Sequence, residues 1–264
     1  MLSYEPQQTA YDLHFQVFGI PVRVHPLFWI ATLVLGSNVW SSGGEANPNA
    51  GTMLLIWVVV MFVSILVHEL GHSFAIRYYG GSPRVVLYMM GGMAITDMGS
   101  SWMPKTSSRR TPQQQIMISL AGPGAGFVLA ALTATALVTM GGDFQLTTVY
   151  PFYDATPSKT MSFSAYVLTE FSLYFNIFWG LVNLLPVLPL DGGQVASQVL
   201  QLNDPWNGFV ASLKLSIFAG IAVALGGWLL LNDMFIALLF GSLAASNYMT
   251  LQQISGGGTG GRPW

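Results

Sequence analysis

Six apolar stretches limit this chain to folds that place most of their surface in lipid. Five of them approach or exceed the roughly 20 apolar residues that a helix needs to cross a bilayer, and the first is shorter. Only 8% of the 264 residues are charged, whereas soluble domains carry about 25%. We therefore predict an all-α polytopic membrane protein with about six transmembrane helices. The stretches cover residues 26–40, 52–79, 114–140, 164–185, 209–231 and 234–250.

The segments between these stretches are rich in Gly, Pro, Asn and Thr, which is typical of loops. One of them, residues 85–96, is rich in β-forming residues and alternates loosely, so we predict a small membrane-associated β-hairpin there. The chain shows no repeat and no shift in composition. We expect a single transmembrane domain at 1–255 and a disordered Gly-rich tail at 256–264.

Composition also excludes several kinds of partner and site. The net charge is -2 and no basic patch is present, which argues against a nucleic-acid partner. The chain has no cysteine, so disulfides and thiolate metal ligands are excluded. The N-terminal residues lack the basic-then-apolar order of a secretory signal, and we expect no cleaved signal peptide.

The basic residues predict an orientation in the membrane. If the N-terminus is cytoplasmic and the chain crosses six times, eight of the nine basic residues lie on the cytoplasmic side and only Lys159 lies outside. Such a bias follows the positive-inside rule, so we expect both termini in the cytoplasm. The eight are Arg23, Arg77, Arg84, Lys105, Arg109, Arg110, Lys214 and Arg262.

The segment HELGH, residues 68–72, places three ionisable side chains inside the second apolar stretch. His68 and His72 are four residues apart, so they share one face of a helix and can bind one zinc ion. Glu69 between them can act as a general base on a water molecule at the metal. Ionisable residues are costly in lipid and mark functional sites there, which favours this interpretation over two buried histidines satisfied by neighbours.

A catalytic zinc site needs a third protein ligand and leaves the fourth position for water. Asp191 is the best candidate by predicted depth, because Pro186 and Pro189 break the helix at the inner end of the fourth stretch. The chain can then fold back toward the metal, although LPLDGG alone also fits an ordinary turn. Glu170 lies near the outer end of that stretch. The other acidic residues after His72 fall in loops or turns: Asp97, Asp143, Asp154, Asp204 and Asp233.

Five motifs together resemble the site-2 protease family of intramembrane zinc metalloproteases. The two specific ones are HELGH and, about 120 residues later, NLLPVLPLDGG at 183–193. Three further motifs support the resemblance. GIPVRVHPLFW at 19–29 resembles the opening of bacterial members with six spans, and YMMGGMAITD at 88–97 resembles the Gly-rich strand after the motif helix. SLAGPGAGFVLA at 119–130 resembles the family's Ala-Gly-Pro helix start.

The resemblance implies an activity and a set of site residues. The family hydrolyses a peptide bond in or near a transmembrane segment of membrane-protein substrates, in regulated intramembrane proteolysis. We accordingly expect one Zn²⁺ per chain, a multi-pass location in a bacterial inner membrane, and no PDZ or nucleotide-sensing domain. The matching residues are the ligands His68, His72 and Asp191, the base Glu69, and Asn183, which is expected to bind substrate. Gly91 and Gly92 in the 85–96 segment are further candidate substrate-binding residues.

One position departs from the family pattern. The family often has an asparagine three residues after the proline of the Ala-Gly-Pro motif, where this chain has Gly126. This weakens any specific role for that helix and leaves the metal ligands untouched. We interpret the small residues there, among them Gly122 and Gly124, as allowing close helix packing.

Several alternatives stay open at this point. A membrane zinc transporter also uses intramembrane His and Asp, but it gives Glu69 no role and needs a second metal site. A membrane-anchored protease for soluble peptides usually takes a downstream glutamate as third ligand, and Glu170 is the only one after His72. The 85–96 hairpin either packs as a structural element or offers a strand edge to an extended substrate. His25 is either structural or an additional ligand or proton relay.

Overall fold

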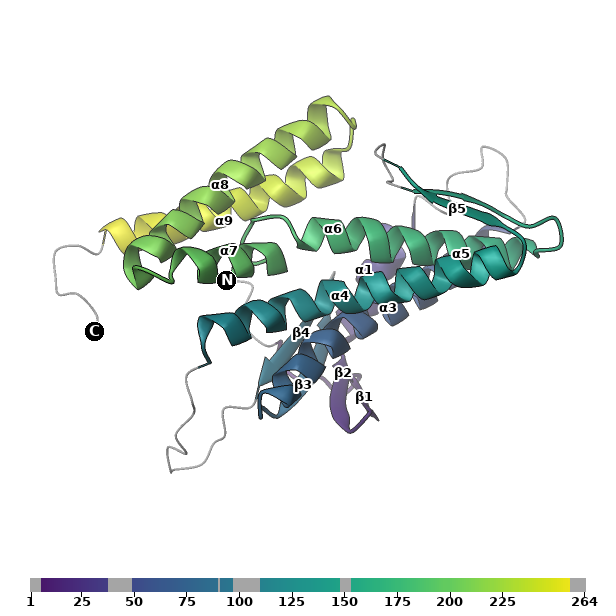
Figure 1. Cartoon of the computed structure of the whole chain (residues 1–264), viewed down its shortest axis with the longest axis horizontal. Helices are drawn as coiled ribbons and strands as arrows, with labels where there is room; N and C mark the ends of the chain where they lie inside the picture. Colours follow the sequence, from purple (N-terminus) through teal and green to yellow (C-terminus); the bar gives the residue numbers. More distant parts are fainter. Residues whose placement is uncertain (1–5, 38–48, 90, 97–109, 148–152, 257–264) are drawn as a thin grey trace. The chain divides into compact units, whose positions relative to one another are not determined.

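The computed structural model describes residues 6–37, 49–89, 91–96, 110–147 and 153–256 (Figure 1). Contacts cluster in two compact units, and each is described by itself. The first unit contains the described parts of 3–108 and 121–182, and the second those of 109–120 and 183–264. Each unit combines segments that are distant in sequence. The prediction of a single domain at 1–255 stays a prediction, and the predicted tail lies outside the described residues from 257 onward.

Five helical segments are long and apolar enough to cross a membrane, and they match the last five predicted stretches. The first predicted stretch forms a shorter helix, α1 (Pro26–Leu35), of 10 residues. The prediction of a helical membrane protein with about six membrane helices is therefore confirmed, with α1 as the atypical member. The five segments are α3 (Ala50–Tyr78), α4 (Pro112–Thr139), the run of α5 (Phe163–Tyr174), η1 (Phe175–Trp179) and α6 (Gly180–Asn183), α8 (Pro205–Leu229) and α9 (Met234–Gly256).

Helix α1 begins at the sheet and ends beside the first turns of α3. His25 caps its start, because His25 Nδ1 accepts a hydrogen bond from the Leu27 N–H at 3.1 Å. Farther along, the indole Nε1 of Trp57 donates to the Thr32 carbonyl at 3.1 Å. A Cβ at Gly36 would clash with the Trp57 ring, so the end of α1 packs directly on α3. The cap favours the structural role for His25.

A four-stranded sheet lies against α3 in the first unit. It is formed by β1 (Leu13–Val17), β2 (Ile20–Val24), β3 (Pro83–Tyr88) and β4 (Gly91–Thr96), in the order β1-β2-β3-β4. The predicted hairpin is present as β3 and β4, which pair antiparallel. Strands β1 and β2 were not predicted from the sequence, because five residues each are too few for a clear alternation. Strand β2 pairs parallel with β3 and so joins the N-terminal hairpin to the predicted one.

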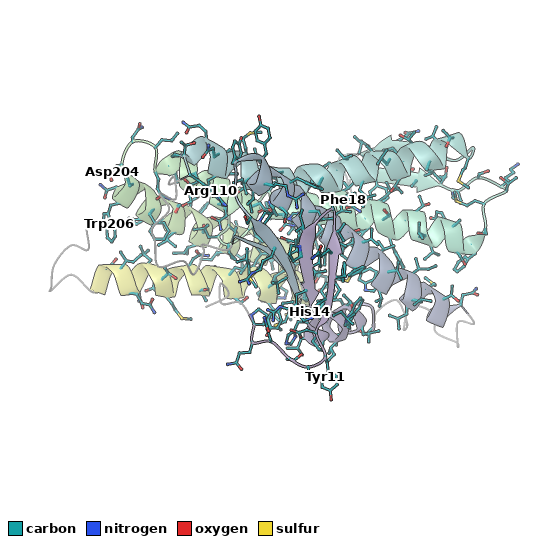
Figure 2. The ribbon with its side chains drawn as sticks, turned by 90° about the horizontal axis from the view of Figure 1, so that it is seen from below. Tyr11, His14, Phe18, Arg110, Asp204 and Trp206 are labelled. Carbon is teal, nitrogen blue, oxygen red and sulfur yellow. The ribbon has the colours of Figure 1, made fainter. Side chains whose placement is uncertain are left out.

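The β1–β2 hairpin is fixed to the C-terminal end of α3. Phe18 and Gly19 form its turn with φ of 51° and 71°, and positive φ at both positions matches the right-handed twist of the strands. Arg77 of α3 donates from its guanidinium to the Phe18 carbonyl at 2.8 Å. Figure 2 labels His14 and Phe18 on this hairpin and Tyr11 just before it. The sheet therefore sits at the end of α3 that carries HELGH.

One apolar core joins the sheet, α1 and α3. Its buried members come from the sheet, α1 and α3, and Phe175 of η1 joins them. The core thereby fixes β3 and β4 beside the last turns of α3, as Figure 1 shows. The buried residues are Ile20, Val22, Val24, Phe28, Val60, Met61, Ile65, Leu70, Val85, Leu87 and Phe175.

The second unit contains α7 (Asp191–Leu200), α8 and α9. Helices α8 and α9 form an antiparallel pair (Figure 1), and their small residues permit close contact, since a Cβ at Gly220 would lie 3.1 Å from Ala244 Cβ. Asp204 begins α8, and its Oδ1 accepts hydrogen bonds from the N–H groups of Trp206 and Asn207 at 3.1 and 3.0 Å (Figure 2). The bonds from Asn207 hold the pKa of Asp204 below its usual value.

Candidate metal centre

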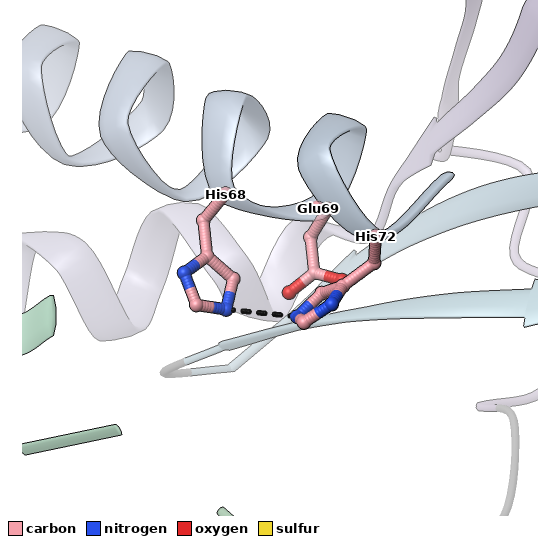
Figure 3. A group of neighbouring side chains, drawn as sticks. All are labelled: His68, Glu69 and His72. Atoms are coloured by element: carbon pink, nitrogen blue, oxygen red, sulfur yellow. Dashed lines mark hydrogen bonds between the residues drawn. The ribbon is translucent and has the colours of Figure 1, made fainter. Parts of the chain in front are cut away.

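Helix α3 brings three potential metal ligands together. His68, Glu69 and His72 project from the same side of the helix (Figure 3), and their ligand atoms all lie within 4.8 Å of one another. The Nε2 atoms of the two histidines are 3.1 Å apart. Two nitrogen ligands on a tetrahedral zinc ion are separated by roughly 3.3 Å. The pair therefore matches the spacing that zinc requires.

The cluster is enclosed by protein. Glu69 and His72 are only 5% and 8% exposed, and His68 is half-buried. A Cβ at Gly122 of α4 would lie 2.8 Å from His68 Nε2 and would clash with His72 Nε2. A Cβ at Gly92 of β4 would lie 2.7 Å from Glu69 Oε1. Because neither position carries a side chain, space remains at the imidazole nitrogens and at the carboxylate, which fits a metal ion held by these residues.

Small residues bring α4 against α3 at this point. A Cβ at Gly71 would clash with the Ala121 carbonyl oxygen and would lie 2.8 Å from Ala125 Cβ. The Ala-Gly-Pro region of α4 is therefore in close contact with α3 at Ala121 and Ala125, as the small residues predicted. The sequence analysis missed that Gly122 faces the histidines. A Cβ at Gly124, two residues farther on, would meet nothing within 4 Å.

A buried asparagine outside α3 donates a hydrogen bond to that helix. Asn176 in η1 is 3% exposed, and its Nδ2 donates to Ser64 Oγ at 2.9 Å and to the Ser172 carbonyl at 2.8 Å. Ser64 lies one helical turn before His68. Single π-turns are frequent at functional sites, and this one places an amide beside the motif helix. The only signal in the sequence was a polar residue inside an apolar stretch.

Two acidic residues that were weighed against Asp191 have structural partners. The Tyr153 hydroxyl of strand β6 (Tyr153–Thr156), which pairs with β5 (Asp143–Leu146), donates to Glu170 Oε1 at 2.8 Å. Burial raises the pKa of Tyr153, and the hydrogen bond to Glu170 raises it further, so the hydroxyl stays protonated as a donor. Asp233 accepts from the Ile236 N–H at 3.1 Å at the start of α9.

The predicted residues Asn183 and Asp191 belong to the second unit. Asn183 ends α6, and the half-buried Asp191 is the first residue of α7. The predicted break lies between them. A Cβ at Gly193 would lie 2.5 Å from the Leu188 nitrogen, so α7 packs tightly on the loop that precedes it. The role of Asp191 as third ligand stays a prediction, as do the roles of Asn183, Gly91 and Gly92 with substrate.

Comparison with known proteins now defines the class. A polytopic membrane fold with an HExxH cluster on an apolar helix is the outline of a membrane metallopeptidase. The model of peptidase family M50 matches residues 56–225. The chain therefore belongs to peptidase family M50, which confirms the resemblance to site-2 proteases stated from the motifs.

Curated relatives have names that contain the words zinc metalloprotease. One from Methanocaldococcus jannaschii, MJ0392, is 26% identical over 238 residues, which are 90% of this chain and 56% of the relative. Rip3 from Mycobacterium tuberculosis is 27% identical over 80% of this chain and 47% of its own length. The relative sll0528 from Synechocystis is 28% identical over 82% of this chain and 52% of its own length. The chain thus spans about half the length of these curated relatives.

A solved structure matches the fold. The site-2 protease from Methanocaldococcus jannaschii aligns with a TM-score of 0.53 at 22% identity, covering 90% of this chain and 94% of that one. Together with the zinc metalloprotease relatives and the cluster on α3, the family supports the predicted zinc cofactor.

The close approach of Gly122 predicts a sharp difference between two glycines of α4. Gly122→Ala should weaken zinc binding by roughly 10- to 100-fold, because the added methyl group forces at least one imidazole out of position. Gly124→Ala is the matched control and should bind zinc as the unaltered protein does, since open space surrounds it. Zinc affinity measured by competition with a chromogenic chelator tests this. Equal affinities for the two variants would contradict the geometry described for α4.

Proposed function

We propose that this chain is an intramembrane zinc metalloprotease that hydrolyses a peptide bond in or near a transmembrane segment of membrane-protein substrates. The position of the cluster carries the proposal. His68, Glu69 and His72 lie on a helix of 29 residues that is long and apolar enough to cross a membrane. Ionisable groups at such a position are costly unless they serve a function. The membership in peptidase family M50 supplies the reaction class.

In this proposal His68, His72 and Asp191 hold one Zn²⁺ per chain. Bound zinc lowers the pKa of a water ligand toward about 7 and polarises the scissile carbonyl. Glu69 accepts the proton of the attacking water and returns it to the leaving amine. Glu69 is buried and its carboxylate lies against Gly92, beside the two histidines, where it could serve in this role.

We place the substrate along β4. This strand is last in the order of the described sheet, and its outer edge pairs with no other described strand. A peptide must be extended before its carbonyl is accessible, and an unpaired strand edge binds extended peptides through backbone hydrogen bonds. Gly91 and Gly92 lie on β4, with Gly92 in contact range of Glu69. Asn183 is assigned to substrate binding by its match to the family motif.

We further propose a bacterial inner-membrane location with both termini cytoplasmic. In this proposal α1 belongs to the first of six crossings, because it begins at the sheet and ends at Gly36 beside Leu54 and Trp57, near the start of α3; its 10 residues alone are about half of a crossing. The sheet strands that precede and follow this pair of helices carry Arg23 and Arg84, as expected for a cytoplasmic side. A transmembrane substrate and the bilayer are the proposed partners, and the sequence names no regulatory protein.

Single cysteines test the orientation cleanly because the chain has none of its own. A cysteine at Lys159 should react with a membrane-impermeant maleimide added from outside intact cells. Cysteines at Ser82 and Asn203, which are also exposed, should react only after the membrane is permeabilised. Labelling of Ser82 or Asn203 from outside would contradict the proposed orientation and the depth assigned to Asp191.

The activity itself is tested with purified chain in detergent and candidate single-span substrates. Cleavage should stop when a zinc chelator is added and should return when zinc is restored, because the proton chemistry of Glu69 requires the metal. A zinc transporter would instead show flux without cleavage. Within the described residues only one group of three potential ligands is present, whereas a transport path needs a second site.

A further inference from the structure

The loop between α6 and α7, residues 184–190, carries irregular backbone at the inner end of a membrane-spanning helix. Its groups must find partners inside the protein, because lipid offers none. The Val187 N–H donates to the Leu185 carbonyl at 2.7 Å, and the Leu190 N–H donates to the Val187 carbonyl at 2.8 Å. These bonds fold the loop on itself and leave the Leu188 peptide groups to be satisfied from elsewhere.

Two buried side chains from the last two helices bind Leu188. The hydroxyl of Ser216 in α8 accepts a hydrogen bond from the Leu188 N–H at 3.0 Å, and Ser216 is completely buried. Asn247 of α9 donates from Nδ2 to the Leu188 carbonyl at 2.8 Å and is 6% exposed. The same Nδ2 also donates to the Leu243 carbonyl of its own helix at 2.8 Å, which fixes the amide orientation. The two residues therefore hold both polar groups of one loop residue.

The loop in turn fixes the start of α7. Leu188 lies three residues before Asp191, and the Gln194 N–H donates to the Leu190 carbonyl at 2.9 Å. Gly192 and Gly193 pack so closely on the loop that a Cβ at Gly193 would lie 2.5 Å from the Leu188 nitrogen. A side chain at either position would clash with the loop backbone, so this close contact between α7 and the loop requires glycine at both positions. A displacement of Leu188 is therefore transmitted to the backbone of Asp191.

We infer that Ser216 and Asn247 are positioning residues for Asp191. They link the α8–α9 pair to the orientation of the third metal ligand, so that the last two helices set the metal affinity without touching the metal. The inference rests on the proposed function, in which Asp191 is that ligand. Residues that orient a metal ligand typically change affinity about 10- to 100-fold when they are removed.

The test uses the full chain and Co²⁺, whose ligand-field absorption reports the geometry of its ligands independently of activity. Ser216→Ala and Asn247→Leu should each raise the Co²⁺ dissociation constant by about 10-fold or more and should shift the absorption bands. Ser216→Thr, which keeps the hydroxyl, should restore both properties to near the starting values. Ser242→Ala is the matched control, because Ser242 of α9 is exposed and, among the described residues, its hydroxyl donates only to the Leu239 carbonyl of its own helix.

A second background separates this inference from the proposed function. In Asp191→Ala protein, Ser216→Ala should cause no further loss, because the ligand through which it acts is already gone. An equal loss in both backgrounds would overturn the positioning role. Unchanged affinity and spectrum in both Ser216→Ala and Asn247→Leu, with a strong loss in Asp191→Ala alone, would overturn the inference and leave the proposed function intact. Unchanged affinity in Asp191→Ala itself would overturn the ligand assignment.

Discussion

Glu69→Gln should lower cleavage by roughly 100-fold or more while zinc remains bound, the usual contribution of a positioned general base. Glutamine keeps the size of the side chain and one oxygen, so the contact with Gly92 is preserved. It cannot accept the proton from the attacking water. The three proposed ligands are untouched, and zinc content measured on the same preparation should equal that of the unaltered protein.

Glu170→Gln supplies the control for this substitution. It makes the same chemical change at a glutamate on α5, whose Oε1 accepts a hydrogen bond from the Tyr153 hydroxyl at 2.8 Å. Cleavage by this variant should stay within a few-fold of the starting rate. If Glu69→Gln protein cleaves substrate at a near-normal rate, Glu69 is not the base and the mechanism proposed for α3 is wrong.

Removal of a direct ligand should have the largest effect on the metal. His68→Ala, His72→Ala and Asp191→Ala should each leave the protein with little zinc after dialysis, because each takes one of three protein ligands from the site. The loss should exceed the roughly 10- to 100-fold expected when a residue only orients a ligand. Zinc per chain, measured by atomic emission, gives the result directly.

Two acidic residues serve as controls for Asp191. Glu170→Ala and Asp204→Ala should retain zinc. Glu170 accepts a hydrogen bond from the Tyr153 hydroxyl, and Asp204 accepts one from the Asn207 N–H in the first turn of α8. Full zinc in the Asp191→Ala protein would show that another group completes the site. Loss of zinc in the Glu170→Ala protein would instead support a different class of membrane protease.

The central part of the site could be predicted because it is local. His68, Glu69 and His72 are close in sequence, and helical geometry alone places them on one side of α3. Their convergence within 4.8 Å agrees with that prediction. Asp191 could be proposed only from predicted depth and from the family motif, because no local rule links residues so distant in sequence.

The contacts that surround the cluster could not be predicted in the same way, although Gly92 and Gly122 had been named for other roles. Gly122 and Gly92 matter through the close approach of α4 and β4, and Asn176 matters through one hydrogen bond to Ser64. Each contact depends on how separate elements pack, which hydrophobic periodicity does not report. The β1–β2 hairpin was missed for a related reason, since β2 is held by parallel pairing with the distant strand β3 and by burial of Ile20, Val22 and Val24 in the core.

The position of the cleaved bond distinguishes intramembrane proteolysis from other protease activity. A single-span substrate is incubated in proteoliposomes with the unaltered chain and with Glu69→Gln protein, and the products are identified by mass spectrometry. The account predicts zinc-dependent cuts within or next to the apolar segment of the substrate, made by the unaltered chain and absent with Glu69→Gln. Cuts confined to soluble regions of the substrate, or cuts that persist with Glu69→Gln, would contradict it.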